Sequence, residues 1–194
     1  MPGLKVLSPW SVEDNRGLLK AAIRDDDPVV FLENEMMYGV EFDYDQSIMD
    51  KDFVIPIGKA KIERAGTDCT IVAHAKMVGW SLQAAEVLAR DHNISAEVIN
   101  LRTIKPLDRY TIIDSVKKTN RIVSVEEGWP QHGVGAEIAG VMMETEAFDY
   151  LDAPMYRITG AEIPMPYSWA IEGMAVPQVE NIVNGVLQTT YRKK

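Results

Sequence analysis

The fold of this chain is decided by the stretch Arg121-Ile-Val-Ser-Val-Glu-Glu-Gly-Trp-Pro-Gln-His-Gly-Val-Gly-Ala-Glu-Ile138. Its apolar run from Ile122 to Val125 predicts a buried strand, the glycines predict an abrupt turn, and a helix is expected to start near Gly135 or Ala136. This order places helix N–H groups at the carboxyl end of a strand, where open α/β sheets bind ligands or partners. A Gly-x-Gly pair without a third glycine is a weak nucleotide signal, so local spacing favours an ordinary strand-to-helix connection.

Strands and helices alternate on both sides of this stretch. The predicted strands are Leu4–Leu7, Val29–Leu32, Thr70–Ala73, Ala96–Leu101, Ile122–Val125 and Tyr156–Thr159. The predicted helices are one that begins at the capping-box-like Ser11-Val-Glu-Asp14 and ends at Asp25-Asp-Asp-Pro28, then Val78–Arg90, Asp108–Lys118, Ala136–Thr145 and Gln178–Thr190. The alternation predicts an α/β fold of three αβα layers around a mostly parallel sheet.

The chain divides into two unequal units. Residues 1–45 hold two strands and one helix, residues 46–60 are expected to be a linker, and residues 61–194 contain a complete α/β unit. Two strands and one helix cannot cover both faces of a sheet. We therefore expect an upstream segment or a partner chain to complete the first unit.

Composition excludes several classes of protein. The formal charge of −9, from 20 basic and 29 acidic residues, argues against a nucleic-acid surface. No apolar run approaches the ~20 residues of a membrane helix, and the first residues resemble neither a signal peptide nor a transit segment. A single cysteine, Cys69, excludes an intramolecular disulfide and indicates a reducing compartment, with Cys69 as a small core residue.

Several segments, in order and from end to end, closely resemble one family, the β subunit of the pyruvate dehydrogenase first component. The most specific are Leu32-Glu-Asn-Glu35, Ile55-Pro-Ile-Gly-Lys-Ala60, Glu97-Val-Ile-Asn-Leu-Arg-Thr-Ile104, Glu127-Gly-Trp-Pro-Gln131 and Thr159-Gly-Ala-Glu-Ile-Pro-Met-Pro-Tyr167. The β subunit of branched-chain 2-oxo acid dehydrogenase shares the Val-Ile-x-Leu-Arg-Thr-Ile segment. That sibling does not usually show the Leu-Glu-Asn-Glu or Gly-Trp-Pro-Gln segments.

The resemblance implies the end of a transketolase-like pyrimidine-binding domain in residues 1–45, followed by a transketolase C-terminal domain. It implies oxidative decarboxylation of pyruvate with acetyl transfer to lipoamide, by a heterotetramer that uses thiamine diphosphate and Mg²⁺ and carries K⁺. The implied partners are the α subunit, a second β subunit and the dihydrolipoamide acetyltransferase core. The implied location is the mitochondrial matrix in a eukaryote and the cytoplasm otherwise.

The resemblance also implies limits and alternatives. The family's catalytic glutamate and histidine lie upstream of these residues, so we expect no catalytic or cofactor-binding residue here and no activity from this chain alone. We then expect the chain to be the C-terminal portion of a larger subunit. The alternatives are a non-catalytic assembly and acyltransferase-docking module, or the β subunit of a branched-chain 2-oxo acid dehydrogenase.

One metal site is expected, at the end of the first helix. Three carboxylates follow the negative end of a helix dipole, and oxygen ligands suit a hard cation, although a solvated acidic turn explains the same composition. By resemblance, K⁺ binds through Ala22, Ile23, Asp25 and Asp27. The family often has Asn at the position of Asp27, and one further ligand lies upstream.

Two interface residues are also expected. The resemblance favours a subunit contact for Trp129 and a contact with a basic patch on the acyltransferase for Asp152, for which a capping or solvated carboxylate is the alternative. His132 is interpreted as a surface or interface residue, and His74 and His92 as structural residues. Glu33 and Glu35 could converge on one face of an extended segment, but packing or hydrogen bonding is the favoured interpretation.

Overall fold

The computed structural model describes residues 1–191, so the last three residues of the predicted 61–194 unit lie outside it. The strands are β1 (Lys5–Leu7), β2 (Val29–Phe31), β3 (Lys61–Arg64), β4 (Cys69–Ala73), β5 (Ala96–Asn100), β6 (Thr103–Lys105), β7 (Ile122–Val125) and β8 (Tyr156–Ile158). The α-helices are α1 (Val12–Ile23), α2 (Lys76–His92), α3 (Arg109–Thr119), α4 (Val134–Glu144), α5 (Trp169–Ala175) and α6 (Val179–Thr189). Three 3₁₀ turns, η1 (Glu35–Met37), η2 (Gln46–Met49) and η3 (Glu146–Tyr150), complete the described elements.

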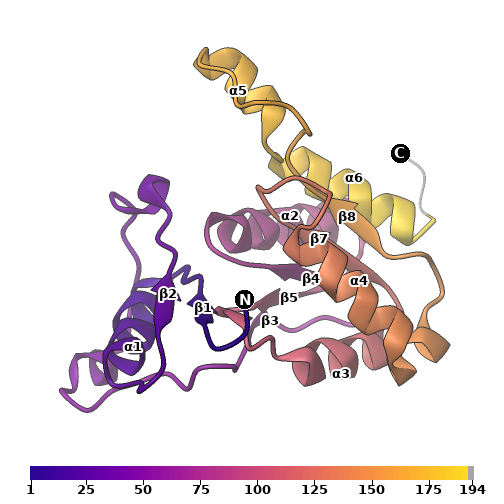
Figure 1. Cartoon of the computed structure of the whole chain (residues 1–194). Helices are drawn as coiled ribbons and strands as arrows, with labels where there is room; N and C mark the ends of the chain where they lie inside the picture. The colour runs from indigo at the N-terminus through magenta and orange to yellow at the C-terminus, as the bar shows by residue number, and fades with distance from the viewer. Residues whose placement is uncertain (192–194) are drawn as a thin grey trace.

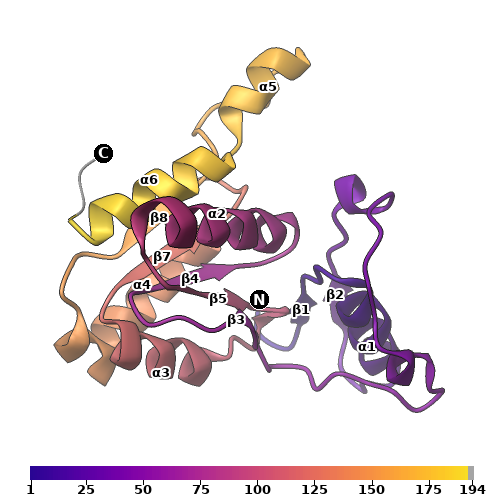
Figure 2. The same ribbon diagram turned by 180° about the vertical axis from the view of Figure 1, so that it is seen from behind.

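The larger sheet has the strand order β3-β5-β4-β7-β8, and only β3 runs antiparallel to its neighbour. Helices α2 and α6 cover one face of this sheet, and α3 and α4 cover the other (Figure 1). The view from behind shows the same three layers (Figure 2). The predicted αβα fold with a mostly parallel sheet is therefore confirmed.

Burial on both faces explains why the central strands are nearly continuous apolar runs. Every residue of β4 is buried, with Ile71 packed among residues of α2 and α6 and Val72 packed among residues of α3 and α4. Cys69 begins this strand with no exposed surface, and burial raises the pKa of its thiol to about 12. The interpretation of Cys69 as a core residue is confirmed.

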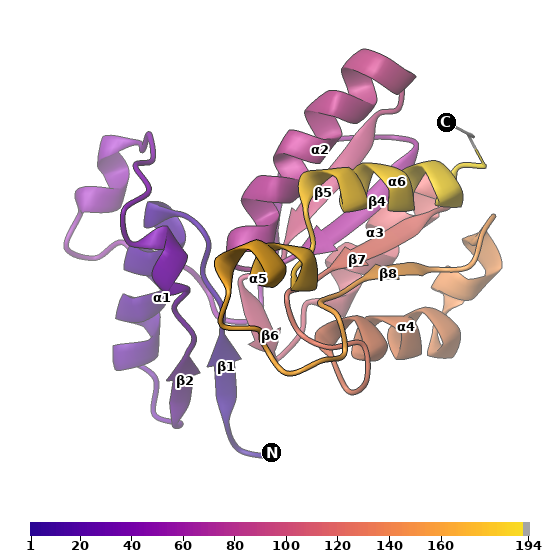
Figure 3. The ribbon, with the colours of Figure 1, turned by 90° about the horizontal axis from the view of Figure 1, so that it is seen from above.

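The smaller sheet, β2-β1-β6, joins the two parts of the chain (Figure 3). Strand β6 comes from the second part of the sequence, yet it pairs antiparallel with β1, with Leu7 opposite Thr103. Leu7, Leu18 and Ile55 form a small core beneath this sheet. The predicted domain boundaries at residues 45 and 60 remain a prediction. The two predicted units nevertheless share one sheet, because β1 pairs with β2 of the first unit and with β6 of the second.

The predicted linker is held against α1 by basic side chains on one face of that helix. Arg16 donates to the carbonyl oxygens of Ile48 (2.6 Å) and Met49 (3.1 Å), and Lys20 donates to those of Asp50 (3.0 Å) and Lys51 (2.6 Å). These residues recur every four positions, so their side chains share a helix face. These hydrogen bonds hold the first part of the predicted linker alongside α1.

Most predicted elements are present with ends shifted by one or two residues, but β3, β6 and α5 were not predicted. Strands β3 and β6 are short, and polar residues occupy three of the four positions of β3 and two of the three positions of β6. Helix α5 stands away from the rest of the molecule (Figures 1 and 2), with Trp169 and Met174 exposed on it. Among residues 1–191 no helix has the length and apolar content that a bilayer crossing requires.

Candidate functional site at the junction of the two units

The carboxyl ends of strands from both units meet at one edge, the position at which open α/β sheets bind ligands. Ser8 follows β1 and His74 follows β4, and the Ser8 hydroxyl lies 3.0 Å from His74 Nδ1. Ser8 is buried and the His74 ring is partly buried. The pair connects the two sheets through a side-chain hydrogen bond.

Glu127, two residues beyond β7, forms a second connection. Its carboxylate lies 2.8 Å from Lys76 Nζ at the start of α2, and it accepts a hydrogen bond of 2.9 Å from the side-chain amide of Asn34. The same ammonium lies 4.8 Å from the centroid of the Trp80 ring, within range of a cation–π contact. Glu127 therefore holds the segment after β2 against the first turn of α2.

Glu126, adjacent to Glu127, closes the amino end of α4. Its carboxylate oxygens accept hydrogen bonds from the N–H groups of Val134 (2.9 Å) and Gly135 (2.8 Å). Added Cβ atoms would lie 2.7 Å from this carboxylate at Gly133 and 2.8 Å from it at Gly135, so the glycines are needed for the close approach. The helix terminus is occupied by a side chain of the chain itself, which confirms an ordinary strand-to-helix connection.

Burial of His74 predicts a pH dependence of stability. The pKa of His74 is lowered because burial disfavours the charged imidazolium, and the carboxylate of Glu127 only partly offsets this effect. The unfolded chain takes up the proton at higher pH than the folded chain, so stability is lost as the pH falls below about 6.5.

We expect the free energy of unfolding, from urea titrations, to fall by at most about 1.4 kcal/mol per pH unit in this window. His74→Gln should reduce that slope. His132→Gln is the matched control, because His132 lies in an exposed turn. An equal change of slope in both variants would contradict the assignment.

The Transketolase, C-terminal domain family model matches residues 58–182, which is more than half of the chain. The chain belongs to this family. The solved split gene transketolase, described as an inactive beta4 tetramer, has the same fold with a TM-score of 0.77 at 23% identity, over 100% of this chain and 59% of that one.

Along essentially its whole length, this member of the transketolase C-terminal family is similar to pyruvate dehydrogenase E1 component β subunits. It is 62% identical to the mitochondrial subunit beta-1 of Oryza sativa subsp. japonica, over 99% of this chain and 51% of that protein. It is 57% identical to the mitochondrial subunit beta of Dictyostelium discoideum, over 100% and 54%. It is 56% identical to the mitochondrial subunit beta of Homo sapiens, over 97% and 52%. The resemblance inferred from the sequence is confirmed, and the chain spans about half the length of these relatives.

The predicted potassium residues lie together at the end of α1, beside a lysine that the sequence did not single out. Lys5 Nζ lies 2.7 Å from both carboxylate oxygens of Asp25 and 3.0 Å from Asp27 Oδ2. The hydrogen bond with Lys5 lowers the pKa of Asp25. Lys5 thus neutralises part of the negative charge after α1 that led us to expect a bound cation.

No group of three or more His, Cys, Asp or Glu side chains within residues 1–191 could hold a metal ion. Any potassium here would therefore depend on the main-chain carbonyls of Ala22 and Ile23 as well as on the carboxylates. The potassium site remains a prediction from the resemblance.

The two predicted interface residues lie on different surfaces. Trp129 is 56% exposed in the turn between β7 and α4. Asp152 lies 3.3 Å from Arg121 Nη2 and borders a groove of about 630 Å³ between α4 and η3 that is lined mainly by apolar side chains such as Met142, Phe148 and Met155. Both positions are accessible to a partner.

The remaining candidates have local roles. Glu33 accepts a hydrogen bond of 2.7 Å from the Tyr38 hydroxyl, while Glu35 begins η1, and both carboxylates raise the pKa of Tyr38. Lys76 and Lys5 were missed because a single lysine in sequence is indistinguishable from a solvated one. Only the fold brings each beside its carboxylate.

Proposed function

We propose that this chain supplies the transketolase C-terminal portion of the β subunit of pyruvate dehydrogenase. In the full complex this enzyme decarboxylates pyruvate oxidatively and transfers the acetyl group to lipoamide, which leads to acetyl-CoA. The observation that carries the proposal is the identity of 56–62% to such β subunits along essentially the whole chain. We propose a mitochondrial matrix location in a eukaryote, since these relatives are named mitochondrial.

The glycine-rich turn before α4 does not fit the diphosphate of thiamine diphosphate. The helix terminus in the glycine-rich turn, which is the natural position for a diphosphate, already holds the Glu126 carboxylate. A second anion there would be repelled. We therefore assign cofactor and Mg²⁺ binding to other parts of the assembled enzyme, and we derive no catalytic step from these residues.

The proposed partners are the α subunit, a second β subunit and the acyltransferase core. Exposed Trp129 and the aromatic residues around α5, Tyr167 and Trp169, support subunit contacts, because large aromatics are enriched in interfaces. The exposed carboxylate of Asp152 beside the apolar α4–η3 groove supports docking of a basic acyltransferase surface. Arg121 would have to release Asp152 in that contact.

The substrate assignment is tested with heterotetramers of α subunit and full-length β subunit. We expect kcat/KM for pyruvate to exceed that for 3-methyl-2-oxobutanoate by at least about tenfold, because a pocket for a methyl group discriminates against added carbons. A β subunit known to belong to the branched-chain enzyme serves as the control. Equal or reversed preference would favour the branched-chain assignment.

We also propose that K⁺ binds at the end of α1 in the assembled enzyme. Lys5, Asp25 and Asp27 together carry one negative charge, which suits a monovalent ion better than a divalent one. We expect Tm in potassium chloride at ten times Kd to exceed Tm in choline chloride by about 3–6 °C.

Asp25→Asn should abolish this difference, and Asp26→Asn, which removes the same charge from the neighbouring position, should preserve it. An enzyme whose Tm is indifferent to the exchange of potassium for choline would show that the acidic turn is merely solvated.

A further inference from the structure

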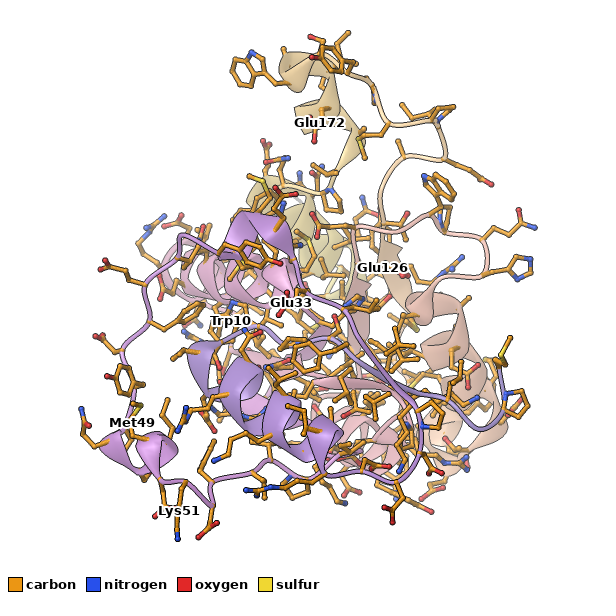
Figure 4. The ribbon with its side chains drawn as sticks, turned by 60° about the vertical axis from the view of Figure 1, so that its left-hand side comes forward. Trp10, Glu33, Met49, Lys51, Glu126 and Glu172 are labelled. Carbon is orange, nitrogen blue, oxygen red and sulfur yellow. The ribbon has the colours of Figure 1, made fainter. Side chains whose placement is uncertain are left out.

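A small pocket lies where the segments after β1 and β2 approach each other. It has a volume of about 230 Å³ and is lined by aromatic, apolar and polar side chains, among them Trp10, Phe42, Tyr38, Met37, Glu33 and Asn34. Trp10 and Glu33, which both line it, lie near each other in the side-chain view (Figure 4). None of the roles proposed above uses Trp10, Phe42 or Glu33.

The aromatic wall of this pocket is held in place from both units. The Trp10 and Phe42 rings form an edge-to-face pair with centroids 5.3 Å apart. A Cβ added to Gly79 of α2 would lie 3.2 Å from the Trp10 indole nitrogen, so the indole lies directly against that helix. The backbone N–H of Trp10 donates to Asp14 at 3.2 Å. The Trp10 ring is therefore positioned before any ligand arrives.

The carboxylate in the pocket, that of Glu33, forms no salt bridge with any of the residues that the structure describes. Glu33 Oε2 accepts the Tyr38 hydroxyl at 2.7 Å, which fixes the orientation of the carboxylate. Within residues 1–191 no lysine, arginine or histidine forms a salt bridge with Glu33. An oriented carboxylate beside aromatic rings attracts a cation through both charge and the ring quadrupoles.

We propose that this pocket binds an arginine side chain of a partner protein chain. A planar guanidinium pairs with a carboxylate and stacks on aromatic faces, which matches the groups present. The volume lies below the ~300–1,000 Å³ of typical small-molecule pockets, so a single side chain is the fitting occupant. The site is separate from the contacts of Trp129 and Asp152 and does not depend on the identity of the enzyme.

The test is a titration of the ¹⁵N-labelled chain with N-acetylarginine amide, monitored through the indole N–H resonance of Trp10. The resonance is identified by its absence in Trp10→Phe. We expect a saturable shift with the arginine probe and none with N-acetylcitrulline amide, a neutral probe of nearly the same shape. The absence of a saturable shift, or equal shifts with both probes, would overturn the proposal.

Two matched variants locate the charge. Glu33→Gln should weaken binding about two- to fivefold, the range for an exposed ion pair. Glu35→Gln removes the same charge two residues away and outside the pocket, and it should leave the affinity unchanged. Equal weakening by both variants would show a diffuse effect of net charge and would contradict a site at Glu33. The spectra also show directly whether each variant is folded.

Discussion

Asp14→Ala is expected to lower the free energy of unfolding by about 3–5 kcal/mol, the cost of leaving a buried charge without its partner. Asp14 has no exposed surface, and its carboxylate accepts hydrogen bonds from Arg102 Nε at 2.6 Å and from the side-chain amide of Asn100 at 2.7 Å. Its second role, in the capping box of α1 with Ser11, adds to the loss.

This effect is large because the network joins the two units. Asp14 belongs to α1, whereas Asn100 ends β5 and Arg102 follows it with a positive φ of 58°. Glu13 extends the network through Arg102 Nη2 (3.0 Å) and Lys61 (2.8 Å). Loss of Asp14 should therefore both destabilise the chain and loosen α1 from the larger sheet.

Urea denaturation measures the loss, and Asp91→Ala is the control because Asp91 pairs with Arg90 at the surface. The control should change stability by less than about 1 kcal/mol. Replacement of both buried partners, in Asp14→Leu with Arg102→Met, should recover part of the loss because no buried charge remains unpaired. If Asp14→Ala costs no more than Asp91→Ala, the network does not hold the units together.

The layered fold could be predicted because its signals are local. Strands β4 and β7 appear in the sequence as short, mostly apolar runs, and α6 appears as an apolar stripe with the helical period. The capping box of Ser11 and Asp14 marks the start of α1. The tight turn after β7 was also predicted, although the reason for its glycines was not. That reason, the carboxylate of Glu126 above α4, depends on a side chain folding back over the turn.

The rest of the site depends on contacts between residues far apart in sequence. Strand β6 is too short to be predicted, and its place beside β1 follows from the joining of the units. The contact between Ser8 and His74 spans 66 residues, and the contact between Asn34 and Glu127 spans 93. No local pattern predicts which lysine or amide will meet these groups, so the sequence could indicate the edge of the sheet but not its pairs.

The second large effect concerns activity. The chain spans about half the length of its β-subunit relatives, and the Glu126 carboxylate closes the N-terminus of α4 in the glycine-rich turn to a diphosphate. We therefore expect the residues described here to provide partner surfaces while cofactor activation requires groups that they do not contain. If the protein served only for assembly or docking, this chain would also show no turnover when it is the only β component. In that case the full-length β subunit would give no turnover either.

The most direct measurement is pyruvate-dependent reduction of an electron acceptor by purified α subunit with thiamine diphosphate and Mg²⁺. We predict no turnover above background when these 194 residues are the only β component. Full turnover should appear when the full-length β subunit replaces them. Turnover with the 194-residue chain alone would contradict the account, because the chain would then contain the cofactor-activating groups that we assign elsewhere.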